Sequence, residues 1–167
     1  MGRYLAILIL CVCTAPFLPG LIENHLGAFK GEQIEAAEST SGSGKRTFRI
    51  TMDRNGHFIA DARLNDRPVE MLVDTGATTA AIPLSIAKEI GIDVDPADFR
   101  HEVRTANGTT YGAGVEIDSL RIGNIHLKHI DAIVLNDQSL GQPLLGMSVL
   151  HELERFDISN GTLVLVQ

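Results

Sequence analysis

The chain reads Val69-Glu70-Met71-Leu72-Val73-Asp74-Thr75-Gly76 and then continues through small and hydroxylated residues to Pro83. This stretch places a carboxylate at the end of a strand-like apolar run and directly before a glycine turn. A carboxylate held on a tight turn at the end of a buried strand is positioned to take or give a proton as a general acid or base. The triplet alone is weak evidence, because Asp-Thr-Gly should occur by chance in roughly a few per cent of chains of this length. The flanking sequence therefore carries much of the argument.

The composition indicates one small domain behind an N-terminal segment. The chain has 167 residues and a formal net charge of −7. Residues 1–46 differ in composition from the rest, which leaves about 120 residues for a fold, within the usual size of one domain. No cluster of Lys and Arg is present, and phosphate binding needs one, so nucleic acid is excluded as a partner.

The N-terminal segment carries no charged side chain from Tyr4 to Ile22, and Arg3 stands just before it. Its length suits a marginal membrane span or a signal peptide, although Pro16 and Pro19 interrupt its second half. No clean small-x-small cleavage site follows, which favours an uncleaved signal anchor over a cleaved signal peptide. With Arg3 on the cytoplasmic side, the positive-inside tendency places the following domain outside the cytoplasm.

Residues 23–46 are rich in Glu, Ser and Gly and are predicted to form a flexible linker, because they cannot bury enough surface to become ordered. The only two cysteines, Cys11 and Cys13, lie in the apolar segment, so no disulfide is expected inside the folded domain. The expected organisation is a signal anchor or signal peptide at 1–22, a linker at 23–46 and one domain at 47–167.

After Lys45 the pattern changes to short alternating runs between turn signals, which predicts β-strands. The strongest turn signal, Asn55-Gly56, predicts a hairpin between Thr47–Arg54 and His57–Leu64, because both turn positions need positive φ. Further strands are predicted at Arg67–Val73 after Asn65-Asp66, at Val103–Val115 around Asn107-Gly108, at Leu120–Leu135 with a break at Gly123-Asn124, and at Phe156–Ser159 and Thr162–Val166 around Asn160-Gly161.

Two short helices are predicted among these strands. Residues 83–91 begin with Pro83, carry an apolar face and end in Gly91, which are the usual start and stop signals. Residues 147–153 are the second candidate. The sum is a mainly β, barrel-like domain with one or two short helices.

Four blocks of sequence, in this order and spacing, resemble those of the retropepsin-like aspartic proteases, and most closely their bacterial, membrane-tethered branch. They span nearly all of residues 47–167. The blocks are Gly56-His57-Phe58, Met71-Leu72-Val73-Asp74-Thr75-Gly76-Ala77, Thr105-Ala106-Asn107-Gly108-Thr109, and Leu144-Leu145-Gly146-Met147-Ser148-Val149-Leu150 with Arg155-Phe156-Asp157-Ile158 after it. The resemblance implies a retropepsin-like acid-protease barrel that acts on polypeptides.

Only one Asp-Thr-Gly motif is present, although the chemistry needs two carboxylates. A water must lose a proton on one side of the amide while the carbonyl oxygen gains one on the other, and two carboxylates sharing a proton do both. Asp118, Asp131 and Asp157 lack the glycine that would let a second backbone approach. The second Asp74 is therefore expected from a second copy of the chain, in a two-fold homodimer.

The resemblance assigns catalytic roles to three consecutive residues. Asp74 of each copy forms the carboxylate pair, Thr75 is expected to hydrogen-bond across its floor, and Gly76 allows the tight turn. Leu144, Leu145 and Gly146 are expected to pass behind Asp74 and support the site, although ordinary core packing also explains them.

The hairpin at residues 103–115 occupies the position of the retropepsin flap, a lid over the substrate. The expected substrate-binding residues are Ala77, Thr105, Ala106, Asn107, Gly108 and Tyr111. An exposed hairpin with no substrate role is the alternative. For Tyr111, a packed or exposed cross-strand tyrosine is as good an explanation as a substrate contact.

One position departs from the retroviral pattern. Many retroviral members carry an Arg after the conserved glycine, where it pins the dimer, whereas this chain has Met147-Ser148. The departure predicts a weak dimer, or one that depends on a membrane tether to raise the local concentration.

No metal or cofactor is expected. His126 and His129 are three residues apart in a predicted strand, which puts them on opposite faces, and no companion Cys or His-Glu-x-x-His motif is present.

The sequence thus predicts a homodimeric aspartic endopeptidase that cleaves exported or membrane-anchored polypeptides. It is expected in a bacterial inner membrane, held by residues 4–22 as a single pass with its domain in the periplasm, or free in the periplasm after signal cleavage. Two alternatives stay open. One is a retropepsin-fold module for dimerisation or peptide binding without turnover, and the other is a latent enzyme that is silent until crowded on a membrane.

Overall fold

A computed structural model describes residues 39–40, 44–105 and 108–167, all of which belong to the unit Ala36–Gln167. The predicted membrane segment at 4–22 and most of the predicted linker lie outside the described residues. Within the part that is described, no helix is long and apolar enough to cross a membrane.

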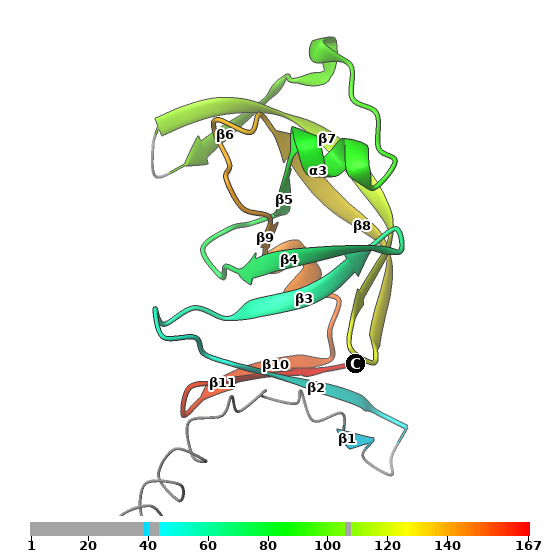
Figure 1. Cartoon of the computed structure of the whole chain (residues 1–167), viewed down its shortest axis with the longest axis vertical. Helices are drawn as coiled ribbons and strands as arrows, with labels where there is room; N and C mark the ends of the chain where they lie inside the picture. Colours follow the sequence, from blue (N-terminus) through cyan, green and yellow to red (C-terminus); the bar gives the residue numbers. More distant parts are fainter. Residues whose placement is uncertain (1–38, 41–43, 106–107) are drawn as a thin grey trace, which may run out of the picture. The chain divides into compact units, whose positions relative to one another are not determined.

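The larger of two sheets has seven strands in the order β3-β4-β9-β5-β8-β7-β6. Strand β3 also pairs with β7, so six of these strands form a closed sheet (Figure 1). Strand β6 pairs only with the first five residues of β7 and extends beyond that closed sheet. The bounds are β3 Ile59–Leu64, β4 Arg67–Val73, β5 Ala80–Pro83, β6 His101–Thr105, β7 Gly108–Ile122, β8 Ile125–Leu135 and β9 Leu144–Leu145. The predicted mainly β, barrel-like class is confirmed.

The smaller sheet has four strands in the order β1-β2-β11-β10, and it packs onto the same core. Alternate residues of its strands point inward, among them Phe48, Ile50, Leu163 and Leu165. Its bounds are β1 Ser39–Thr40, β2 Arg46–Thr51, β10 Arg155–Ser159 and β11 Thr162–Val166. Strand β1 falls inside the predicted linker and pairs with the first two residues of β2.

The core follows from period-two burial along the strands, since successive side chains of a strand point to opposite faces. In β3 the residues Ala60, Ala62 and Leu64 are buried and their neighbours are not. Strand β8 changes phase at His129, whose φ is 54°, so that buried positions shift from Leu127 to Ile130. No buried polar or charged residue occurs among the described residues, so the interior is an apolar core.

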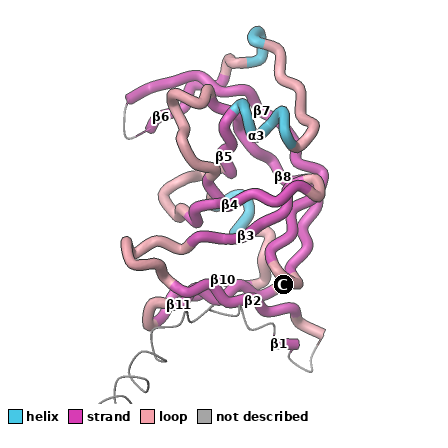
Figure 2. The backbone as a smooth tube through the Cα atoms, viewed as in Figure 1, coloured by secondary structure: helices cyan, strands magenta, loops and turns pink. Residues whose placement is uncertain are grey.

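Short helices fill the connections between strands (Figure 2). Helix α3 spans Leu84–Glu89 and Gly91 follows with φ 82°, so the helix predicted at 83–91 exists in a shorter form. Pro83 belongs to β5 instead, because the chain is still extended there. Helix α4 spans Met147–Leu150, against the predicted 147–153, and the 3₁₀ helix η3 spans Pro96–Asp98.

The hairpin predicted around Asn55-Gly56 is wrong. Gly56 has φ 87°, but Asn55 is not among the residues with positive φ, and β2 and β3 belong to different sheets. The Asp53 carboxylate closes the turn by accepting from the backbone N–H groups of His57 at 2.7 Å and Asn55 at 2.8 Å. These hydrogen bonds, that of His57 foremost, lower the pKa of Asp53. The turn therefore connects strands of two different sheets, and β2 and β3 do not pair with each other.

Two other turns do connect antiparallel strands that pair with each other. Asn65 and Asp66, with φ 46° and 65°, link β3 to β4, and Asn160 and Gly161, with φ 48° and 71°, link β10 to β11. Positive φ at both central positions matches the twist of the strands they join.

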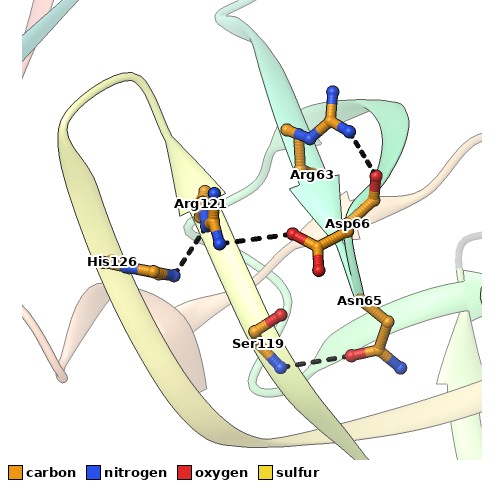
Figure 3. A network of polar contacts seen from close by, with 6 residues as sticks. All are labelled: Arg63, Asn65, Asp66, Ser119, Arg121 and His126. Atoms are coloured by element: carbon orange, nitrogen blue, oxygen red, sulfur yellow. Dashed lines mark hydrogen bonds and ion pairs between the residues drawn. The ribbon is translucent and has the colours of Figure 1, made fainter.

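The first of these turns is also fixed to the rest of the sheet (Figure 3). The Asn65 amide accepts from the Ser119 backbone N–H at 3.1 Å and donates to the Ile90 carbonyl at 3.2 Å. Beside it, Arg121 forms an ion pair with Asp66 at 3.3 Å and donates to His126 at 2.7 Å. The ion pair is exposed and contributes little. The Asn65 side-chain amide, together with the Asn65 backbone N–H that donates to the Ser119 carbonyl at 3.0 Å, therefore ties this turn to β7, and the amide alone ties it to the end of α3.

Replacing Asn65 by Ala should destabilise the domain more than replacing Asn160 by Ala. Both residues sit first in a turn with positive φ, so the backbone strain is matched. Only Asn65→Ala also leaves the Ser119 N–H and the Ile90 carbonyl without their partner, which should add about 1–3 kcal/mol to the loss of unfolding free energy. Urea unfolding of both variants measures the difference, and equal losses would contradict the role given to the amide.

Candidate active site

Asp74 follows β4 and begins a turn that its own carboxylate closes. Its Oδ1 accepts from the Gly76 N–H at 2.8 Å, and its carbonyl accepts from the Ala77 N–H at 3.2 Å. Its backbone N–H donates to the Leu145 carbonyl at 3.1 Å. Asp74 is half-buried, the Gly76 N–H orients its carboxylate, and the Ala77 N–H and the Leu145 carbonyl hold its backbone.

Gly76 leaves room for this carboxylate. A Cβ at this position would lie 3.1 Å from Asp74 Oδ1, the same oxygen that accepts the Gly76 N–H. Any side chain would press on the carboxylate it is meant to support. The glycine of the motif thus orients the acid.

Strand β9 supports the turn from behind. Leu144 and Leu145 pair in parallel with Leu72 and Val73 of β4, and Leu144 also pairs with Ala81 of β5. Leu145 is completely buried. The two arms of the Asp74 loop are therefore bound to one short strand that comes from about 70 residues later in the chain.

Residues after β9 hold the far side of the same loop. Met147 N–H donates to the Ala77 carbonyl at 2.8 Å, and Ser148 N–H donates to the Thr78 carbonyl at 3.0 Å. The Ser148 hydroxyl accepts from Ala80 N–H at 2.9 Å and donates to the Asp131 carbonyl at 3.2 Å. Ser148 is one of the two residues that stand where the retroviral pattern has Arg, and here it ties the loop within its own chain.

An open cavity of about 700 Å³ lies beside Asp74. Of the residues proposed from sequence for catalysis, substrate binding or support, five line it. They are Asp74, Gly76, Ala77, Thr105 and Leu144. The sequence reasoning missed the other lining residues, namely Thr78, Thr79, Ala81, Glu102, Val103, Arg104, Ile133, Leu135, Ser139 and Leu140. Strands, the loop after Asp74 and the 136–143 loop meet here, and no local pattern reveals that meeting.

The remaining candidates lie elsewhere on the chain or outside the described residues. Thr75 and Gly108 are exposed, and Tyr111 is 55 % exposed on strand β7. None of these three lines the cavity of a single chain. Ala106 and Asn107, at the tip between β6 and β7, are not described.

The β6–β7 hairpin is linked to the opposite wall. The Thr110 hydroxyl on β7 lies 3.1 Å from the Ser139 hydroxyl, which belongs to the 136–143 loop between β8 and β9. Val103 and Thr105 of β6 face the cavity and are half-buried. The hairpin and this loop thus enclose the space beside Asp74.

The ionisable groups of the cavity limit its chemistry. Asp74 and Glu102 are the only carboxylates among the lining residues described, and Glu102 lies exposed on β6. No group of three or more His, Cys, Asp or Glu residues that could bind a metal ion occurs in the described part of the chain. One Asp can take or give a proton, but it cannot do both at once on the two sides of an amide.

Comparison with known proteins identifies the family to which the chain is similar. The family described as gag-polyprotein putative aspartyl protease matches residues 60–152. A solved structure of a retropepsin-like aspartic protease from Rickettsia conorii is 32 % identical, with a TM-score of 0.65, over 73 % of this chain and 91 % of that one. The EIAV protease complexed with the inhibitor HBY-793 shares the fold, with 16 % identity and a TM-score of 0.51 over 62 % of this chain and 93 % of that chain.

Two relatives match in sequence. An uncharacterized protein in the cobV 5′ region of a Sinorhizobium species is 37 % identical over 69 % of this chain, and the uncharacterized protein RP867 of Rickettsia prowazekii (strain Madrid E) is 32 % identical over 70 %. Each match spans 49 % of the relative, so the match covers about half the length of these proteins.

Replacing Gly146 by Ala should displace the Asp74 loop. A Cβ there would lie 2.5 Å from the Thr79 carbonyl oxygen and 2.8 Å from that of Ala77, and backbone cannot move aside cheaply. We expect a loss of about 3 kcal/mol in unfolding free energy. Gly141→Ala in the preceding loop is the control, because nothing lies within 4 Å of its added Cβ. Similar losses in both variants, measured by urea unfolding, would contradict this account.

Proposed function

Because the chain belongs to the retropepsin-like aspartic proteases, we propose that it is an aspartic endopeptidase whose active site is shared by two copies. The observation that carries the proposal is the Asp74 turn, in which a half-buried carboxylate is oriented at the edge of a large open cavity. Fixed orientation of a reacting group is what catalysis gains from such a scaffold.

The chemistry requires two carboxylates close enough to share one proton. Two like charges about 3 Å apart cannot both ionise, so one Asp74 is protonated while its counterpart is a base. The base takes a proton from a water that attacks the amide carbon. The acid gives its proton to the carbonyl oxygen, which forms a neutral tetrahedral intermediate. The pair then gives the proton it took from water to the amide nitrogen and takes one from a hydroxyl of the intermediate, so that the C–N bond breaks and the amine leaves as the carboxylic acid forms.

The second Asp74 is proposed to come from a two-fold related copy. A two-fold axis beside the Asp74 turn would bring two identical carboxylates together. Thr75, next to Asp74, is exposed, and within the described residues its hydroxyl has no hydrogen-bond partner. A partner across the axis would satisfy that hydroxyl and join the two turns.

The cavity supports a polypeptide as substrate. It is lined by the loop after Asp74, by β5, β8 and β9, by the 136–143 loop and by β6 of the β6–β7 hairpin, and it opens to solvent. An extended chain could lie between them while the hairpin closes over it and excludes water.

We also propose that residues 4–22 hold the protein at a bacterial inner membrane, with the domain on the periplasmic side. The proposal rests on the uncharged stretch from Tyr4 to Ile22 with Arg3 before it. The substrates would then be exported or membrane-anchored polypeptides. A tether would also raise the local concentration of a weakly associating domain.

Asp74→Asn should abolish cleavage without unfolding the protein. The amide keeps the shape of the side chain but cannot act as the acid–base pair, so cleavage of a diverse peptide library should fall by about 10²–10⁴-fold or more. The assay uses the full-length chain with its N-terminal segment, from pH 3 to 8, and records dimer content in the same samples. Asp118→Asn is the control, because Asp118 is exposed on β7 and does not line the cavity beside Asp74.

Cleavage that persists in Asp74→Asn would contradict the proposed mechanism. A stable wild-type dimer that binds peptides but never cleaves them would instead identify a retropepsin-fold binding module. That outcome is disfavoured by the intact Asp-Thr-Gly turn, since a pair of half-buried carboxylates is costly to a protein that only binds.

A further inference from the structure

Gly112 lies where strand β7 changes partners. The flap hairpin ends with the pair His101 and Gly112, and pairing with β8 begins one residue later with Ala113 and Val134. Gly112 is buried, whereas Gly114, on the same face two residues on, is exposed. The two glycines therefore occupy similar backbone positions in different surroundings.

The space in front of Gly112 is filled by two side chains of β8. A Cβ at this position would lie 2.6 Å from Cγ1 and 2.8 Å from Cδ1 of Ile133, and 2.8 Å from Cδ2 of Leu135. Real Cβ atoms essentially never come so close, so both side chains would have to move or the strand would have to shift. Both Ile133 and Leu135 line the cavity beside Asp74.

From these contacts we infer that Gly112 determines the size of substrate side chain that the cavity accepts, by letting Ile133 and Leu135 retract from it. The inference rests on the proposed function, because it concerns the same site. Gly112 does not line the cavity. It is a specificity-determining residue that acts through the two side chains packed against it.

The surroundings indicate what kind of side chain is selected. Ile133 and Leu135 share the cavity with Ala81, Leu140 and Leu144, so this wall is apolar. Ile133 is half-buried, which leaves part of it facing the open space. A displaced Ile133 has that open space available, whereas Leu135 is buried at 2 % exposure and has little room to move.

The expected effect is large because the discrimination is steric. One methylene more or less in an apolar pocket changes the preference between substrates by roughly 10–200-fold. A methyl group at residue 112 that pushes Ile133 inward should therefore change the relative use of large and small side chains. The chemistry at Asp74 needs no such change.

Gly114 provides a matched control. Its added Cβ would meet only the His101 ring, at 3.3 Å from Nε2, and His101 does not line the cavity. Gly112→Ala and Gly114→Ala thus make the same substitution on the same strand and face. If the glycines served instead as a hinge for the flap, both variants would lower kcat and neither would change side-chain preference.

The test compares kcat/KM of the full-length wild type and both variants on peptides that differ at one subsite, from Ala through Val and Leu to Phe. Gly112→Ala should lower the ratio for large over small side chains by about tenfold or more, and Gly114→Ala should leave it unchanged. Adding Ile133→Ala to Gly112→Ala removes both conflicting Ile133 atoms and should return the ratio towards that of the wild type. An unchanged ratio in Gly112→Ala, or the same change in both single variants, would overturn the inference.

Binding separates this inference from the proposed function. The same peptides, labelled for fluorescence anisotropy, are bound to Asp74→Asn with and without Gly112→Ala, so that no turnover is needed. Selective loss of affinity for the large side chains supports the inference even if the wild type proves inactive. Should Gly112→Ala fail to fold, Ile133→Ala alone must shift both binding and cleavage towards larger side chains, and an unshifted preference would refute the role of this wall.

Discussion

The whole site depends on the main chain of residues 144–148 lying behind the loop that carries Asp74. That segment accepts one hydrogen bond from Asp74 N–H and donates two to the carbonyls of Ala77 and Thr78. The contact is possible only because Gly146 has no side chain, since a Cβ would come within 2.8 Å of two loop carbonyls. A loop fixed through its backbone depends little on side-chain contacts for its shape, which suits a site that must hold a carboxylate in one orientation.

The same constraint explains why the fold is a closed sheet. Strand β9 has two residues, yet it pairs with β4 on one side and with β5 on the other. Without it the sheet would open between the strand that enters the Asp74 loop and the strand that leaves it. Ser148 continues this role beyond the strand by bonding Ala80 and Asp131. Residues 144–148 therefore contribute both to the stability of the barrel and to the orientation of Asp74.

The sequence predicted the elements whose signals are local. Strand β4, the turns at Asn65-Asp66 and Asn160-Gly161, and the strands on either side of Gly123 all follow from alternation and from residues that tolerate positive φ. The Asn55-Gly56 hairpin failed because a turn signal fixes a reversal of the chain but not which sheet each strand joins. Here the Asp53 carboxylate closes the turn, and β2 and β3 on its two sides join different sheets.

The sequence pattern did not predict features that depend on contacts between distant segments of the chain. A two-residue strand such as β9 has no period to detect, and β5 is a run of four buried residues that reads equally well as part of a helix. Asp74 was found because its motif is contiguous. Ile133, Leu135 and Leu140 reach the cavity only through the pairing of β8 with β5 and β7 and through the loop that follows it, so their place in the site became evident only in three dimensions.

The central claim is that one catalytic centre is built from two chains, and mixing subunits tests it most directly. Full-length wild type and Asp74→Asn are combined in varied ratio at constant total concentration, allowed to exchange, and assayed for cleavage. A shared centre predicts that activity follows the square of the wild-type fraction, so an equal mixture retains about a quarter of the wild-type rate. A linear decline, with about half of the rate retained, would mean that each chain carries a complete site of its own and would contradict the account.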